Sequence, residues 1–97
     1  MALTPEAKVK AAVKRILDSL GIYHFSPFQA GMGRAGIPDI ICCYEGRFVA
    51  IECKAGKGKT TPLQDRELNA IQTAGGTAWV VNEDDLPTLK ERLLCLK

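Results

Sequence analysis

The stretch GIPDIICCYEGRFVAIECK, residues 36–54, decides the fold that the chain is expected to adopt. Residues 38–44 form a short apolar run, Glu45-Gly46 have the composition of a tight turn, and residues 47–54 form a second, largely apolar run. Two such runs joined by a two-residue turn predict a β-hairpin. The segments before and after the hairpin predict the further strands of the sheet and the helices that pack on it.

The segment before the hairpin predicts a helix and then a strand. Thr4 as N-cap and Pro5 at the first helical position begin a helix, whose apolar residues recur at helical spacing until Gly21. Residues 22–28 are rich in strand-forming side chains. Pro27 restricts this strand to a sheet edge or to an early end, because proline has no N–H to donate.

The segment after the hairpin predicts a helix, a strand and a last helix. Thr61 and Gln64 form a capping box that begins a helix expected to run to about Ala74 and to stop at Gly75-Gly76. Residues 77–81 have the composition of a strand. The last helix is marked by Leu86, Leu89, Leu93 and Leu94.

The order helix, three strands, helix, strand, helix predicts one α/β domain over residues 1–97, with a mixed sheet between helices. No apolar run approaches the roughly 20 residues of a membrane span and no signal peptide is recognisable, so we expect a cytoplasmic protein without a membrane partner. The cysteines have no metal-binding spacing and are expected to be buried and reduced; they are Cys42, Cys43, Cys53 and Cys95.

The net charge of +2 is too small to identify a nucleic-acid binder, so the distribution of charge is more informative. Basic residues gather in residues 8–15 and again in residues 54–59. The acidic residues Glu83, Asp84 and Asp85 lie well away from both groups along the chain.

Two glycine patterns resemble nucleotide-binding motifs, and both fail. Gly31, Gly33 and Gly36 have the spacing of a dinucleotide fingerprint, but a strand pattern follows them where that motif requires a helix. Residues 58–60 resemble the end of a Walker A motif, but Cys53 occupies the position of its first glycine. We therefore expect no nucleotide cofactor, and interpret residues 31–36 as a pliable loop.

A group of charged residues remains, at Asp39, Glu52 and Lys54. Because side chains alternate along a strand, Glu52 and Lys54 share a face, and the hairpin puts Asp39 on the neighbouring strand. Two carboxylates with the Cys53 carbonyl between them suit Mg²⁺ or Mn²⁺. Lys54 could orient a water held by the ion or stabilise charge on an attacked phosphate. The pattern therefore favours phosphodiester hydrolysis.

Each of these residues also has a simpler interpretation. Glu6 lies on the inward, apolar line of the first helix, but a glutamate in the first turn can also act only on the helix dipole. Asp39 follows a proline and can be a turn residue, while Glu52 and Lys54 can form a solvated charge pair. Gln64 is explained by its capping box.

The ordered set of motifs resembles the VRR-NUC family, the virus-type replication and repair nucleases of the PD-(D/E)XK superfamily. The resemblance is carried by Glu6 and by residues 36–41, 46–64 and 74–81, and it points to compact stand-alone members from phages and bacteria. It implies a restriction-endonuclease-like core with the order α-β-β-β-α-β-α. It also implies the cytoplasm of a bacterium or of a phage-infected host.

The resemblance further implies a role for each residue of the site. The divalent metal would be bound by Asp39, Glu52, the Cys53 carbonyl and Glu6, the last directly or through water. The catalytic residues would be Asp39, Glu52, Lys54 and Gln64. Lys54 would be the catalytic lysine, and Gln64 would act in the site as well as in the helix cap.

Stand-alone members of this kind resemble Holliday-junction resolvases that act as homodimers, so the resemblance implies a structure-selective endonuclease for four-way DNA junctions. A symmetric dimer would supply two sites for paired cuts, with the last helix or an edge strand as its interface. Arg34, Lys57 and Lys59 are expected to guide the DNA backbone. A flap or non-selective nuclease stays open as an alternative, as does a non-catalytic DNA-binding module with the same fold.

Overall fold

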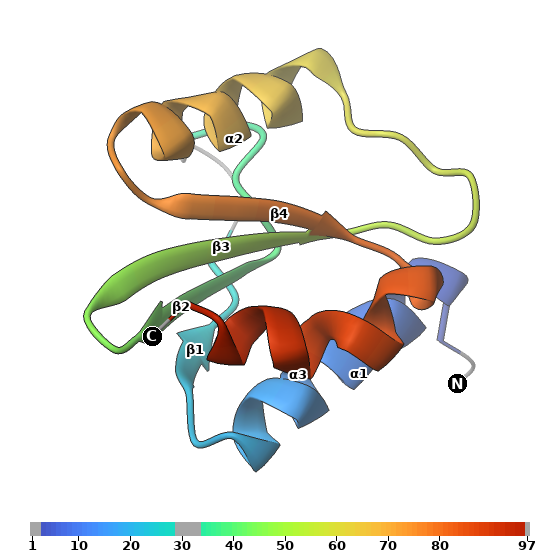
Figure 1. The fold of residues 1–97 in the computed structure, drawn as a ribbon. Helices are drawn as coiled ribbons and strands as arrows, with labels where there is room; N and C mark the ends of the chain where they lie inside the picture. Colours follow the sequence, from blue (N-terminus) through green and yellow to red (C-terminus); the bar gives the residue numbers. More distant parts are fainter. Residues whose placement is uncertain (1–2, 29–33, 97) are drawn as a thin grey trace.

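A computed structural model describes residues 3–28 and 34–96 of the chain (Figure 1). Its elements are α1 (Pro5–Ser19), β1 (Tyr23–Phe25), β2 (Ile40–Tyr44), β3 (Arg47–Cys53), α2 (Pro62–Thr73), β4 (Thr77–Val81), the 3-10 helix η1 (Glu83–Asp85) and α3 (Leu86–Leu94). The order α-β-β-β-α-β-α expected from the sequence is confirmed, with the short helix η1 added immediately before α3.

The four strands form one mixed sheet in the order β1-β2-β3-β4. β2 pairs antiparallel with both β1 and β3, and the pair Tyr44 and Arg47 closes the hairpin that residues 36–54 predict. β4 pairs parallel with β3, which requires a crossover connection, and α2 supplies it. β1 is an edge strand, as Pro27 predicts.

Helices cover the two faces of the sheet unequally (Figure 1). Val49, Ile51 and Cys53 of β3 belong to the larger core, which α1 and α3 cover. Ala50 belongs to a smaller core on the other face, where it lies with Leu68 of α2. Because side chains alternate along β3, Glu52 shares the face of Ala50 and points toward the side of the sheet that carries α2.

Three of the four strands are shorter than expected, and β4 has the expected bounds. β1 ends at Phe25 instead of Phe28, and β2 begins at Ile40 instead of Pro38, because prolines at 27 and 38 have no N–H to give to a ladder. β3 ends at Cys53, level with the end of β4 at Val81, although the Lys54 N–H still donates to the Val81 carbonyl at 2.9 Å.

The helix ends follow the local signals. The Thr4 hydroxyl accepts the Ala7 N–H at 3.1 Å at the start of α1, and Gly21 follows its end with φ of 68°. Thr61 and Gln64 form the complete capping box at the start of α2. No helix in the described ranges is long and apolar enough to cross a membrane.

The expectation that all the cysteines are buried is wrong for two of them. All four are free thiols, but Cys43 and Cys95 are exposed, whereas Cys42 and Cys53 are buried. Adjacent strand residues point to opposite faces, so Cys42 enters the larger core and Cys43 points away from it. Cys95 is the C-cap residue of α3.

Candidate metal site

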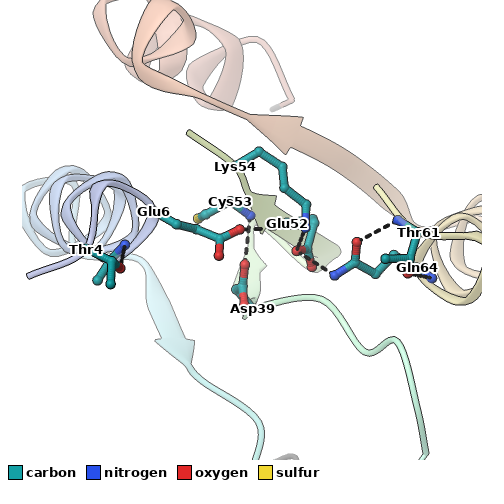
Figure 2. Close-up of polar contacts among 9 residues, drawn as sticks. Thr4, Glu6, Asp39, Glu52, Cys53, Lys54, Thr61 and Gln64 are labelled. Atoms are coloured by element: carbon teal, nitrogen blue, oxygen red, sulfur yellow. Dashed lines mark hydrogen bonds and ion pairs between the residues drawn. The ribbon is translucent and has the colours of Figure 1, made fainter. Parts of the chain in front are cut away.

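Three carboxylates converge at one end of the sheet. Glu6, Asp39 and Glu52 each offer one carboxylate oxygen, and these oxygens all lie within 4.8 Å of one another. Glu6 comes from the first turn of α1, Asp39 directly precedes β2, and Glu52 is the penultimate residue of β3 (Figure 2). The structure therefore brings together the three acidic residues that the sequence singles out.

The hairpin register positions Asp39. Ile40 pairs with Ile51, so the residue before β2 comes to lie beside the end of β3. There the Asp39 Oδ2 atom accepts the Cys53 N–H at 2.9 Å. Asp39 thus lies in the bend before β2, as expected of a turn residue, and its carboxylate also belongs to the acidic cluster.

Glu52 is the buried member of the cluster, at 2% exposure. Its Oε2 atom accepts a hydrogen bond from Gln64 Nε2 at 3.1 Å, while its buried Oε1 atom has no hydrogen-bond partner among the described residues. Burial, and then the charge of Asp39, raise the pKa of Glu52 to about 7, although Lys54 opposes both effects. A buried carboxylate with a free oxygen is a site where a cation would be stabilising.

Lys54 lies over the cluster with a largely buried side chain. Its Nζ atom lies 3.4 Å from Glu52 Oε2 and 3.6 Å from Glu6 Oε1 (Figure 2). Glu6 therefore faces the site and does more than act on the helix dipole, although its side chain is half exposed. One ammonium cannot neutralise three carboxylates, so ionisation of the whole cluster would leave an excess of negative charge.

Gln64 has two partners, which the capping interpretation alone does not explain. Its Oε1 atom accepts the Thr61 N–H at 2.9 Å and completes the capping box. Its Nε2 group donates to Glu52 Oε2 at 3.1 Å. The N-terminus of α2 is thereby joined directly to the buried carboxylate.

The donor set fits a hard divalent cation. Carboxylate oxygens are the ligands that Mg²⁺ and Mn²⁺ prefer, and the unpartnered Glu52 Oε1 atom offers one in a buried position. The Cys53 side chain does not join this set, because it lies in the larger core. Burial first, and then the charges of Asp39 and Glu52, raise the pKa of the Cys53 thiol to about 12. A role for the Cys53 carbonyl stays a prediction.

A groove opens beside the cluster, with a volume of about 610 Å³. Its lining includes Thr4, Pro5 and Glu6 from the start of α1, and Lys54, Lys59 and Glu83 from the opposite side. Lys59 thus lines the same groove as Glu6 and Lys54, and its expected role in guiding a DNA backbone stays a prediction. Lys57 is exposed on the same loop but does not line the groove.

Arg34 has a partner that the sequence did not suggest. Its Nε group donates to Oε1 of Glu67 in α2, and Glu67 is buried at 6% exposure. This hydrogen bond and the opposite charges raise the pKa of Arg34 and lower that of Glu67. The Arg34 side chain is still 64% exposed, so its expected contact with DNA stays a prediction.

Gly36 is explained by packing within the chain. It has φ of 78°, and a Cβ atom there would lie 2.6 Å from the backbone carbonyl carbon and oxygen of Leu63. Only glycine allows this approach between the segment before β2 and the start of α2. The other glycines of the predicted pliable loop, Gly31 and Gly33, lie outside the described residues.

Glu83 is the site residue that sequence reasoning missed. The chain separates it from the basic segment by 27 residues, yet its carboxylate accepts the Gly56 N–H. The separation of the acidic stretch from the basic residues thus holds along the chain, whereas the fold brings Glu83 into contact with the basic loop. The sequence carries no local signal for this contact, because it depends on where β4 delivers the chain after Val81.

Comparison with known proteins gives one relative in sequence. No family model matches the chain. The protein named "Putative nuclease p44", of Acyrthosiphon pisum secondary endosymbiont phage 1, is 34% identical over 58 residues, which cover 59% of this chain and 62% of the phage protein. The matched region is therefore less than two thirds of that relative's length.

Two solved structures share the fold. One, described as "VRR_NUC domain", has a TM-score of 0.78 at 24% identity and covers 92% of this chain and 97% of its own. The other, described as "VRR_NUC domain protein", has a TM-score of 0.69 at 20% identity and covers 99% and 93%. Likeness at such identities concerns the fold. The chain therefore has the VRR-NUC fold, as the resemblance carried by its motifs predicts.

Proposed function

We propose that the chain is a divalent-metal-dependent nuclease that hydrolyses phosphodiester bonds in DNA. The observation that carries the proposal is the convergence of the Glu6, Asp39 and Glu52 carboxylates within 4.8 Å, beside the ammonium of Lys54. The VRR-NUC fold and the name of the phage relative support it.

The carboxylates and the lysine have different roles in this chemistry. Glu6, Asp39 and Glu52 would hold Mg²⁺ or Mn²⁺, which supplies Lewis-acid charge when bound. Lys54 stabilises negative charge that accumulates on the phosphate oxygens. Two contacts hold the carboxylates in place, from the Cys53 N–H to Asp39 and from Gln64 to Glu52.

The DNA backbone would enter through the groove beside the cluster. Lys59 lines that groove, and Lys57 extends the basic surface from the same loop. Lysines attract phosphates without reading bases. Selectivity is therefore expected to follow the shape of the DNA more than its sequence.

The finer part of the proposal is a homodimer that cuts four-way junctions. Leu89 and Leu93 of α3 are buried in the chain's own core, so they are not available to a partner. At the opposite side, Tyr23 of β1 is 69% exposed, and Phe25 of β1 and Phe48 of β3 are each 47% exposed. The rings of Tyr23 and Phe25 lie 6.2 Å apart between centroids, and adjoining exposed apolar side chains are typical of interfaces, so the β1 edge is the favoured one.

One experiment tests activity and preference together. Purified protein is incubated with labelled four-way junction, flap, nicked and linear duplex DNA, with Mg²⁺ or Mn²⁺ and with Lys54→Ala as the matched control. A resolvase cuts the junction at paired positions, and a flap or non-selective nuclease cuts the other substrates at similar or higher rates. Binding without cleavage of any substrate would support the non-catalytic module instead.

A further inference from the structure

Glu83 holds the loop that follows β3. Both oxygens of its carboxylate accept the Gly56 N–H, at 2.8 and 3.1 Å. Gly56 has φ of 56°, a conformation that favours glycine, and it is the third residue after β3 ends. The contact therefore joins η1, which precedes α3, to the start of the basic loop at residues 54–60.

The loop is held at both ends. The Gly58 N–H donates to the Ala55 carbonyl at 2.9 Å, which closes a turn that contains Gly56. At the other end, the Thr60 hydroxyl donates to the Asp65 carboxylate. Lys59 lies between these points and lines the groove. Its backbone position thus depends on the turn that Glu83 anchors.

Glu83 also lines the same groove, where its charge opposes the proposed ligand. The hydrogen bond from Gly56 lowers the pKa of Glu83, so the carboxylate stays ionised at neutral pH. A fixed negative charge beside a path for phosphates repels them. Considered as a charge alone, Glu83 would weaken DNA binding, and its removal would strengthen it.

We propose that Glu83 is a positioning residue for DNA binding: it fixes the Gly56 turn and so presents Lys59 to the phosphate backbone beside the acidic cluster. This role rests on the proposed nuclease function. Glu83 touches neither the DNA nor the metal ligands in this role, and its effect passes through the loop. Loss of Glu83 is therefore expected to weaken DNA binding, whereas removal of its negative charge alone would strengthen it.

Asp84 provides a matched control. It is the next residue of η1, is exposed, and carries the same charge. Its backbone N–H donates to Asn82 Oδ1, but its carboxylate makes no hydrogen bond with the described part of the chain. Asp84→Ala removes a charge of the same sign from the same element without releasing Gly56.

The test compares wild type with Glu83→Ala, Glu83→Gln, Asp84→Ala and Lys59→Ala. The dissociation constant for duplex and four-way junction DNA is measured without divalent metal over a series of salt concentrations, and kcat and KM are measured with Mn²⁺. Glu83→Ala should raise Kd and KM on the order of fivefold, the size expected for one lost phosphate contact. The plot of the logarithm of the binding constant against the logarithm of salt concentration should become less steep by about 0.9. The kcat value should stay within about twofold of wild type.

The other variants separate positioning from charge. Glu83→Gln keeps an acceptor oxygen for Gly56 and should recover most of the affinity. Asp84→Ala should bind DNA as wild type or slightly more tightly. In the Lys59→Ala background, Glu83→Ala should have no further effect, because the two changes remove the same contact. Exchange of the Gly56 amide hydrogen in the free protein should be faster in Glu83→Ala, which tests the anchor without DNA.

The outcomes distinguish this role from the proposed function. A Glu83→Ala protein that binds DNA as tightly as the Asp84→Ala protein, or effects of Glu83→Ala and Lys59→Ala that add fully, would overturn the positioning role alone. Wild-type protein that does not bind DNA would overturn the proposed function, and this role with it. If Glu83→Ala does not fold, Glu83→Gln still decides the question, because loss of the charge alone would tighten DNA binding beyond wild type, whereas the positioning role expects no such gain.

Discussion

Gln64 joins the N-terminus of α2 to the buried carboxylate of Glu52. The same amide accepts the Thr61 N–H at 2.9 Å and donates to Glu52 Oε2 at 3.1 Å. A residue that begins a helix is thereby also a residue of the acidic cluster. Because one amide serves both ends, a change of Gln64 affects both roles, whereas loss of the Thr61 hydroxyl affects the cap alone.

Gln64→Ala and Thr61→Ala separate those roles. Both changes break the capping box, and each should lower the free energy of unfolding by about 1 kcal/mol in urea titrations. Only Gln64→Ala also releases Glu52, so only Gln64→Ala should lower the rate of DNA cleavage, on the order of tenfold. Equal losses of activity in the two variants would limit Gln64 to a capping role.

Asp39→Asn should abolish cleavage and keep the fold. The asparagine carbonyl oxygen can still accept the Cys53 N–H, but the cluster loses one of its three negative charges. Cleavage of junction DNA should fall on the order of 100-fold or more. Binding of DNA in the absence of divalent metal should stay within about twofold of wild type. Cleavage near the wild-type rate with Mg²⁺ or Mn²⁺ would contradict the assignment of this residue.

Addition of Mn²⁺ or Mg²⁺ should stabilise the protein. A ligand that binds only the folded state adds about 2.7 kcal/mol at a concentration 100 times its dissociation constant. Thermal melting should therefore move upward with metal concentration in wild type and much less in Asp39→Asn. A chelator should reverse the shift. An equal shift in both proteins would show that the metal binds outside the acidic cluster.

The metal-free protein should lose stability as the pH rises. Burial raises the pKa of Glu52 from 4.5 to about 7, so the folded state holds this proton more tightly than the unfolded chain does. The resulting stability is fully present below pH 4.5 and is lost as the pH rises through 7, by at most about 3 kcal/mol.

Glu52→Gln provides the control for this pH dependence. Urea unfolding at a series of pH values should show the fall in wild type and a smaller fall in Glu52→Gln, so the difference isolates this group. Saturating Mn²⁺ should reduce the fall in wild type, because a bound cation favours the ionised carboxylate. Parallel curves for the two metal-free proteins would contradict a raised pKa at Glu52.

Changes at the β1 edge should disrupt the proposed homodimer. Tyr23→Ser combined with Phe25→Ser removes two exposed aromatic rings, whose centroids lie 6.2 Å apart. Light scattering should then report the mass of one chain, whereas Leu94→Ser on α3 should leave the dimer intact. A wild-type protein with the mass of one chain would instead rule out paired cuts by a symmetric dimer.

Much of the fold follows from local signals in the sequence. The alternation and turn of residues 36–54 specify the hairpin, and the caps at Thr4 and Thr61 specify where helices begin, because these signals act between residues a few positions apart. The acidic cluster could be predicted for a related reason. The hairpin alone puts Asp39 beside Glu52, and helical periodicity puts Glu6 on the inward line of α1.

The tertiary structure decided the contacts that local signals do not reach. Glu83 meets Gly56 across 27 residues because the α2 crossover returns β4 parallel to β3. Arg34 meets Glu67 across 33 residues because the segment before β2 packs against α2. Cys43 is also exposed for a reason that the sequence does not show. Strand alternation tells which face of the sheet a side chain points to, but not whether a helix covers that part of the face. The sequence by itself determined the elements and the residue types of the site. Packing of distant segments determined which charges are buried, paired or left to bind a ligand.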